Sequence, residues 1–116
     1  MSDQETTIAQ LRAAVQHFVD ERDWRQFHSP KNLSMAIAIE SAELMEHFQW
    51  LGSEESREVR SSPESMLQVR EELADILCFA LSFANALDID ISSAVADKLV
   101  KNAQKYPADR YRGRFR

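Results

Sequence analysis

Two stretches of the sequence each place two acidic side chains inside an apolar segment. IESAELMEHFQW contains Glu40 and Glu43, and VREELADILCF contains Glu72 and Asp75, with the same spacing of three residues in both pairs. At about 100° per residue in a helix, the first acid of each pair falls within the apolar stripe and the second falls at its edge. With the neighbouring turns included, the stripes consist of Leu33, Ile37, Leu44 and Phe48 around the first stretch and Val69, Ile76, Phe79 and Phe83 around the second. The pattern predicts two helices that carry acids toward the interior of one fold.

The turn-forming residues favour an all-α fold. The chain of 116 residues has two glycines and three prolines, fewer than a β-rich domain of this size normally uses. Ser62 as an N-cap before Pro63 marks a helix start. The expected helices run from about Glu5 to Arg22, Asn32 to Trp50, Pro63 to Leu87 and Ile91 to Lys105, with a loop at Trp24 to Lys31 and a polar connection at Leu51 to Ser62. We therefore expect one domain, residues 1–116, built as a four-helix bundle.

Acids on an apolar stripe need compensation. An isolated carboxylate costs several kcal/mol to remove from water. Protonation, a basic partner or a divalent cation would each reduce that cost, but the stripes contain no basic residue and Arg70 falls on the opposite face. A cation would also relieve the repulsion among four acids. Glu40, Glu43, Glu72 and Asp75 are therefore predicted to be catalytic metal ligands, and their oxygens suit Mg²⁺, with Mn²⁺ as an alternative.

Two other interpretations of these acids are a di-iron site and a set of structural or exposed acids. A di-iron bundle would use Glu-x-x-His on two helices. That motif does not occur, because His47 follows Glu43 by four residues and Glu46 by one. Structural or exposed acids are the other alternative, and two matched inward-facing pairs argue against it.

Positive charge is concentrated at one end of the chain. Residues 98–116 hold seven of the 14 Lys and Arg residues and one of the 19 Asp and Glu residues. Lys98, Asn102 and Lys105 share one helical face, and Tyr106 follows them. This face is interpreted either as a phosphate-binding surface or as a solvated basic face. The basic tail at residues 108–116 is open to the same two interpretations, a flexible solvated segment or a site for an anionic ligand.

Aromatic residues gather around the first loop. Trp24, Phe27 and His28 lie in it, and Trp50 ends the second expected helix. Indoles beside a polar loop serve either as core anchors or as platforms for a nucleobase. The sequence alone leaves both roles open.

Several classes of protein are disfavoured. No apolar run approaches the roughly 20 residues of a membrane span, and the acidic MSDQETT start does not predict a secretory signal. One cysteine, Cys78, excludes an internal disulfide and suits a reducing compartment, so we expect a cytoplasmic protein. A net charge of −5 argues against a nucleic-acid partner.

Together, ERDWRQFHSPKNL, AIESAELMEHFQW, EELADIL and KLVKNAQKYP resemble the all-α nucleotide pyrophosphohydrolases of the MazG-like superfamily, and within it the dCTP pyrophosphatases. The similarity runs from about Phe18 to Pro107. It implies that the four acids bind Mg²⁺. It also implies substrate-binding roles for Trp24, Trp50 and His28 at the base and for Lys98, Asn102, Lys105 and Tyr106 at the phosphates and sugar.

The resemblance also implies an activity and an assembly. The expected reaction converts a dNTP, with dCTP-like nucleotides preferred, and water into dNMP and diphosphate, in the service of nucleotide-pool sanitation. Glu43 is one candidate for the proton acceptor. A dimer, or a tetramer built as a dimer of dimers, would complete each pocket with a neighbouring subunit, and apolar residues on both sides of the third helix independently favour such an interface.

The sequence departs from the family pattern in two respects, and two other functions remain alternatives. Val15 stands where some dCTP-specific relatives place a histidine, which leaves the base preference open, and no long extension follows the KYP segment. Hydrolysis of another phosphoanhydride, such as that of phosphoribosyl-ATP, is a second enzymatic reading. A non-catalytic helical module that binds a nucleotide or partner is the alternative from another class.

Overall fold

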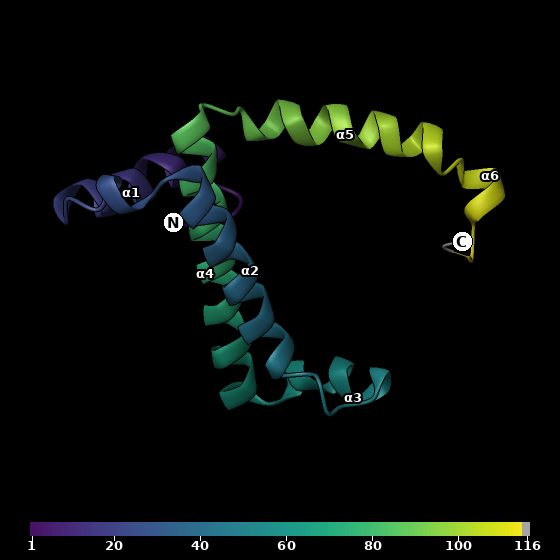
Figure 1. The fold of residues 1–116 in the computed structure, drawn as a ribbon. Coiled ribbons are helices and arrows are strands. Elements are labelled where there is room, and N and C mark those ends of the chain that lie inside the picture. The colour runs from purple at the N-terminus through teal and green to yellow at the C-terminus, as the bar shows by residue number, and fades with distance from the viewer. Residues whose placement is uncertain (115–116) are drawn as a thin grey trace.

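Helices account for all the regular structure within residues 1–114, the part of the chain that the computed structural model describes, and no strand occurs there (Figure 1). The elements are α1 (Ile8–Glu21), η1 (Arg25–Phe27), α2 (Pro30–Glu46), α3 (Ser53–Glu58), η2 (Val59–Ser61), α4 (Pro63–Leu87), α5 (Ile91–Lys105) and α6 (Ala108–Tyr111), where η denotes a 3-10 helix. The predicted all-α class is confirmed. The last two residues of the expected tail, 115–116, lie outside the described residues.

The first helix begins later than predicted because of its cap. Thr7 is the N-cap of α1, and its hydroxyl accepts a hydrogen bond of 3.1 Å from the backbone N–H of Gln10. The Gln10 side chain in turn accepts one of 2.8 Å from the Thr7 N–H. This reciprocal pair satisfies two N–H groups at the helix end, so α1 begins at Ile8 and the predicted start at Glu5 is wrong.

The second helix is displaced toward the N-terminus relative to the prediction. Ser29 caps α2 by accepting a hydrogen bond of 3.1 Å from the Asn32 N–H, and Pro30 occupies the first helical position. Proline is tolerated there because the first-turn N–H groups have no helical partner. The helix thus begins at Pro30 instead of Asn32, and it ends at Glu46 instead of Trp50.

The connection between α2 and α4 contains more structure than predicted. It folds into α3 and η2, and the Glu55 carboxylate accepts a hydrogen bond of 3.3 Å from the Gly52 N–H at the start of α3. The bounds predicted for α4 and α5 are confirmed. Ser62 caps α4 as expected, and Asp88 ends it in the left-handed conformation with φ of 53°.

The core lies where α4 meets α2 and α1. α2 runs alongside α4 for most of its length, and α1 crosses the C-terminal half of α4 (Figure 1). Leu33 of α2 is 1% exposed, and Leu81 and Ala84 of α4 are buried together with Val19 of α1. The α2–α4 pair is therefore the frame that positions the acids described below.

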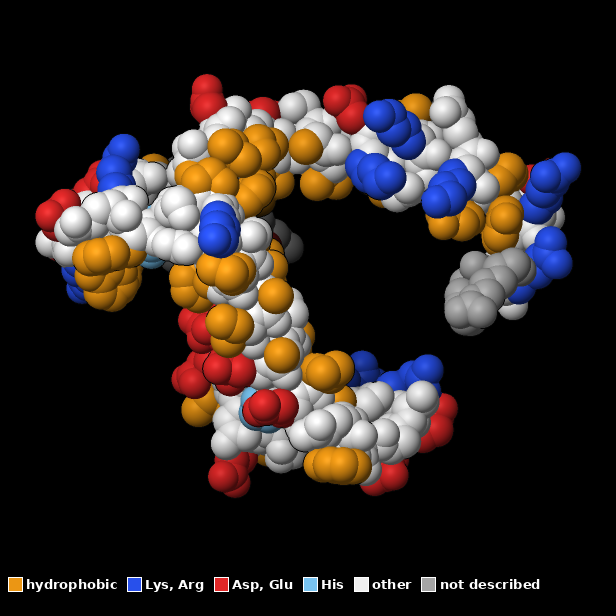
Figure 2. Space-filling view, in the orientation of Figure 1, with side chains coloured by type: hydrophobic (Ala, Val, Ile, Leu, Met, Phe, Trp, Pro, Cys, Tyr) orange, Lys and Arg blue, Asp and Glu red, His pale blue; other side chains and the backbone are white. Residues whose placement is uncertain are grey.

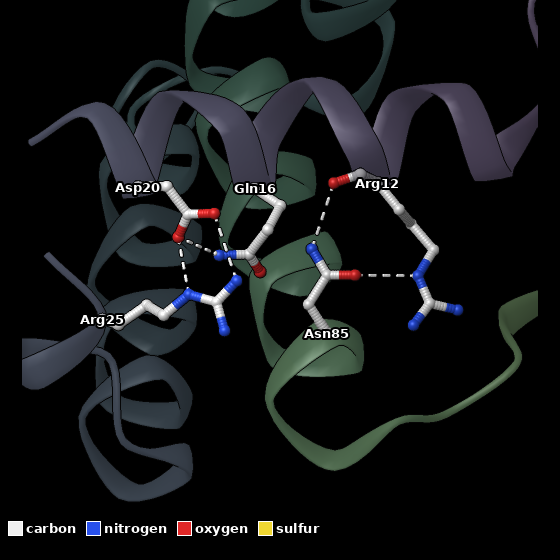
Figure 3. A network of polar contacts seen from close by, with 5 residues as sticks. All are labelled: Arg12, Gln16, Asp20, Arg25 and Asn85. Atoms are coloured by element: carbon white, nitrogen blue, oxygen red, sulfur yellow. Dashed lines mark hydrogen bonds and ion pairs between the residues drawn. The ribbon is translucent and has the colours of Figure 1, made fainter. Parts of the chain in front are cut away.

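A polar network fastens α1 to the end of α4 (Figure 3). The Arg12 guanidinium donates to the Asn85 side-chain oxygen at 3.0 Å and to the backbone carbonyls of Ile89 at 2.6 Å and Ala84 at 3.3 Å. The Asn85 amide returns a hydrogen bond of 3.1 Å to the Arg12 carbonyl. The planar fork of Arg12 thus binds the Ala84 carbonyl at the end of α4, which also accepts the Ile89 N–H at 2.9 Å, and the Ile89 carbonyl just beyond the helix.

Arg12→Ala is expected to lower the free energy of unfolding by about 2 kcal/mol, since it removes charge-assisted hydrogen bonds from a half-buried contact. Arg12→Lys should recover little, because an ammonium cannot reproduce the fork. Urea unfolding at one fixed protein concentration measures both values. Arg22→Ala is the matched control, because Arg22 donates only to a carbonyl of its own exposed helix end; an equal loss in both variants would contradict the prediction.

The fourth expected helix does not close a bundle within one chain. α5 projects from the end of α4 and packs along none of the other helices of residues 1–114 (Figure 1). The accessible surface is 9449 Å², whereas a compact chain of 13.3 kDa exposes about 6,500 Å². The radius of gyration is 17.1 Å against about 13 Å for a compact domain of this length. The apolar side chains of α5 therefore have no partner helix within residues 1–114 of the same chain.

Large apolar side chains are exposed on several of the helices. They include Met35 and Ile39 on α2, Leu73 and Leu77 on α4, and Val95 and Leu99 on α5. Among residues 1–114 no single helix has the length and hydropathy of a membrane span; only α4 and α5 taken together, bent by 100° where they meet, satisfy that criterion of length and composition.

Candidate metal centre and adjoining cavity

Three carboxylates from two helices meet on the α2–α4 pair. Glu40 and Glu43 lie one turn apart on α2, and Glu72 reaches them from α4. One oxygen from each of the three lies within 4.8 Å of the others. The meeting follows from the shared register of the two apolar stripes, which brings their embedded acids to the same level when the helices pack.

The three acids, which we call the acidic cluster, are incompletely satisfied by the protein. Glu40 and Glu72 are half-buried, and Oε2 of each is buried without a hydrogen-bond partner among the described residues. Burial, a hydrogen bond with Glu43 and the negative charges of Glu43, Asp75 and Glu72 raise the pKa of Glu40 from 4.5 to about 7. The cluster therefore holds negative charge at a site that disfavours it.

A divalent cation fits this arrangement. Three closely spaced carboxylates, two of which have a buried oxygen without a hydrogen-bond partner, form a donor set of hard oxygen ligands, which Mg²⁺ and Mn²⁺ prefer. Arg and Lys side chains form no ion pair with the acidic cluster anywhere in residues 1–114, so no Arg or Lys of the described chain neutralises it. The residues at hand thus suit a bound cation better than they suit a metal-free core.

The raised pKa of Glu40 predicts how stability depends on pH without metal. The folded protein retains the Glu40 proton up to about pH 7, whereas the unfolded chain releases it near 4.5. Stability is then greatest below the unfolded value and falls as pH rises through this interval. Solvent screens the half-buried group, so we expect a loss of about 1 kcal/mol, or roughly 4 °C in the melting midpoint.

Thermal melts in a chelator at about pH 5 and about pH 8 measure this difference. Glu40→Gln is the matched control, because it removes the titrating carboxyl and should flatten the dependence. A wild-type midpoint that rises over the same interval would contradict the assignment. With Mg²⁺ present the trend should reverse, since the cation binds the deprotonated carboxylates.

A cavity of about 460 Å³ adjoins the acidic cluster between α1, α4 and the loop before α2. Trp24, His28 and Asp75 line it together with Phe79 and Val15. The rings form a chain, with 6.4 Å between the centroids of Trp24 and His28 and 6.3 Å between those of His28 and Phe79. The volume falls within the roughly 300–1,000 Å³ that is typical of small-molecule sites.

Asp75 belongs to this cavity more than to the cluster. It is exposed and is not one of the three acids within 4.8 Å of one another, although its charge acts on Glu40. The helical offset of Asp75 from Glu72 explains the placement, because it turns Asp75 toward α1 and the loop. The structure therefore brings three of the four predicted ligands together and puts the fourth at the boundary between cluster and cavity.

The other predicted binding residues lie away from both features in the single chain. Trp50 is 88% exposed beyond the end of α2. Lys98 and Lys105 are exposed on α5, Asn102 is half-buried there, and the Tyr106 ring contacts that of Tyr111 edge-on at 5.2 Å. In Figure 2 the Lys and Arg side chains gather on the α5–α6 arm, whereas a group of acidic side chains lies along the opposite edge of the α2–α4 pair.

Sequence reasoning missed two residues near the cluster and the cavity. Phe79 was assigned only to the apolar stripe, yet it walls the cavity one turn beyond Asp75. His47 was rejected as a di-iron ligand, yet its Nε2 lies 3.7 Å from Glu72 Oε1. His47 follows Glu43 by four residues, so the two side chains lie on one face at the end of α2. This spacing could have identified His47 as a neighbour of the acidic cluster.

Comparisons with known proteins agree with the geometry. A model of the MazG-like family matches residues 35–114. The chain is 38% identical over 109 residues to dCTP pyrophosphatase 1 of Bos taurus and 38% identical over 104 residues to that of Homo sapiens, covering 94% and 90% of this chain. It spans 64% and 61% of those proteins' length, less than two-thirds. The crystal structure of a pyrophosphatase from Archaeoglobus fulgidus superimposes with a TM-score of 0.81 at 37% identity, covering 92% of this chain and 98% of that one.

Proposed function

This chain belongs to the MazG-like family, and we propose that it is a divalent-metal-dependent nucleotide pyrophosphohydrolase. The proposed reaction converts a dNTP, with dCTP-like nucleotides preferred, and water into dNMP and diphosphate. The observation that carries the proposal is the acidic cluster beside an aromatic cavity of about 460 Å³, a metal site next to a site for a flat ring. A cytoplasmic role in nucleotide-pool sanitation is part of the proposal.

In the proposed step, a water oxygen forms a bond to the α-phosphorus. The bond from that phosphorus to the oxygen bridging to the β-phosphate breaks, and diphosphate leaves with the bonding electrons. A bound Mg²⁺ or Mn²⁺ supplies charge neutralisation at the phosphates and acidifies water. Glu40, Glu43 and Glu72 would hold the cation with Asp75 beside them, and one carboxylate of this set would accept the proton of the water.

The cavity is proposed to bind the nucleobase. Trp24, His28 and Phe79 present a row of neighbouring rings to the cavity, and a planar heterocycle would stack against this row. Val15 contributes only an aliphatic wall. Val15 offers a base no hydrogen bond at that point of the cavity, so we expect a preference for dCTP-like nucleotides without strict exclusion of others.

We further propose that the active form is a homo-oligomer, either a dimer or a dimer of dimers, in which α5 of one copy reaches the acidic cluster of another. The exposed apolar residues of α2, α4 and α5 and the excess surface of the single chain support this. Lys98, Asn102, Lys105 and Tyr106 would then meet the phosphates and sugar of a nucleotide that the neighbouring copy holds. Trp50, exposed in the single chain, would likewise be covered at the interface.

Product analysis tests the reaction. The protein is incubated with each dNTP and Mg²⁺ in water labelled with the heavy oxygen isotope, and products are separated by ion exchange and mass analysed. We expect unlabelled diphosphate and a dNMP that carries the label. Release of inorganic phosphate and dNDP would show that the wrong bond was assigned, and absence of turnover with every dNTP and with phosphoribosyl-ATP would favour a binding module.

A further inference from the structure

A histidine touches the acidic cluster from the end of α2. His47 is the C-cap residue of this helix, and its backbone N–H bonds back to the Leu44 carbonyl at 3.2 Å. The imidazole reaches across to α4, where Nε2 lies 3.7 Å from Glu72 Oε1. The two side chains are only 27% and 22% exposed. The contact is therefore enclosed, unlike the pair of His17 and Glu21 on α1, whose side chains are 77% and 54% exposed.

The two oxygens of Glu72 have different surroundings. Oε1 faces the His47 ring, whereas Oε2 is buried and has no hydrogen-bond partner within residues 1–114. A carboxylate held at one oxygen loses its freedom to rotate, so the second oxygen keeps a fixed direction. Ligands of metal ions are commonly fixed in this way by outer partners, whose loss typically costs about 10–100-fold in metal affinity.

We propose that His47 is a positioning residue for Glu72, holding Oε1 through Nε2 and leaving Oε2 for the divalent cation. This rests on the cation site of the proposed function. At 3.7 Å the pair is longer than a hydrogen bond, so a small rotation of either side chain must close it when the site is loaded, as polar contacts in active sites often tighten on ligand binding.

Direct ligation by His47 is a different arrangement with a different signature. The carboxylates of Glu40, Glu43 and Glu72 form the group within 4.8 Å of one another, and the imidazole is not part of it. A ligating imidazole would place nitrogen next to the cation, which pulsed EPR of bound Mn²⁺ detects as a nitrogen coupling. A positioning role predicts carboxylate and water oxygens only.

The test compares two amides that differ by one methylene. Gln places its amide nitrogen near the location of Nε2, whereas the Asn nitrogen stops near that of Nδ1, and both suit a polar helix end. Mn²⁺ is titrated into the protein without nucleotide and free Mn²⁺ is followed by EPR. We expect His47→Asn to weaken Mn²⁺ binding by about 10–100-fold and His47→Gln to bind within a few-fold of wild type. In turnover assays, added Mg²⁺ should restore the rate of His47→Asn.

Glu46→Gln is the matched control, because Glu46 precedes His47 on the exposed surface of α2 and its loss should not change Mn²⁺ affinity. Wild-type affinity in His47→Asn would overturn the positioning role, and so would equal weakening in His47→Gln or a nitrogen coupling in the EPR spectrum. Failure of the wild-type protein to bind Mn²⁺ at all would instead reject the cation site itself. Melting curves confirm that each variant is folded.

Discussion

Glu40→Gln is expected to reduce dNTP hydrolysis by about 10³-fold and, at neutral pH without metal, to raise the melting midpoint. The first effect follows because a cation stabilises the charged transition state by several kcal/mol, and each 1.36 kcal/mol corresponds to tenfold in rate. The second follows because the neutral amide removes a charge that burial and three neighbouring acids already disfavour. Opposite signs for activity and stability distinguish a metal ligand from a residue of the packing core.

Initial rates with dCTP and melts with and without Mg²⁺ measure the two effects. Glu46→Gln removes an exposed acid from the same helix. It should change the initial rate by no more than a few-fold and the melting midpoint by no more than about a degree. Wild-type activity in Glu40→Gln, or a fall in its metal-free midpoint, would show that the carboxylate does not serve a cation. Mg²⁺ should also stabilise wild type and fail to stabilise the variant.

Two inactive variants are expected to restore each other's activity when their subunits mix. Lys98→Ala should lose about 10²–10³-fold in turnover if Lys98 steadies the departing diphosphate, and Glu72→Gln should lose the cation. In the single chain α5 projects away from the acidic cluster, so in the proposed assembly a working site combines Glu72 of one copy with Lys98 of another. A mixed dimer then contains one intact site and one doubly altered site.

Coexpression of the two variants with different affinity tags isolates the mixed dimer. Random pairing in a symmetric dimer predicts about a quarter of wild-type activity in the unfractionated mixture, and about half in the isolated heterodimer. Wild-type subunits carried through the same procedure provide the reference. If the verified heterodimer is as inactive as each parent, Lys98 does not act on a neighbouring copy's site, and the proposed assembly is wrong.

The sequence predicted the acidic cluster through helical geometry. Glu40 and Glu72 lie within apolar stripes, and stripes of two neighbouring helices must face each other to be buried, so their embedded acids meet. The limits of α4 and α5 were also predicted, because Ser62, Pro63 and the residues before Pro107 act locally. Helix faces and helix ends that are determined by residues within about one turn can therefore be predicted from the sequence.

The rest depends on contacts that no periodicity encodes. The start of α2 depends on the Ser29 hydroxyl, which accepts a hydrogen bond from the Asn32 N–H. The folding of residues 53–61 into helical turns depends on a short polar segment with no apolar stripe. The contact of His47 with Glu72 joins residues from two helices. The position of α5 differs from that in the predicted bundle for another reason. Its exposed Val95 and Leu99 indicate burial against something outside the single chain, and the periodicity of a sequence does not say which chain covers an apolar face.

The most direct measurement of the central claim is a crystal structure of the protein with Mn²⁺, with diffraction data collected at the manganese absorption edge. An anomalous peak is predicted about 2.2 Å from carboxylate oxygens of Glu40, Glu43 and Glu72, with the Trp24 cavity beside it. A map that shows Mn²⁺ only elsewhere, with these three carboxylates turned apart into solvent, would contradict the account.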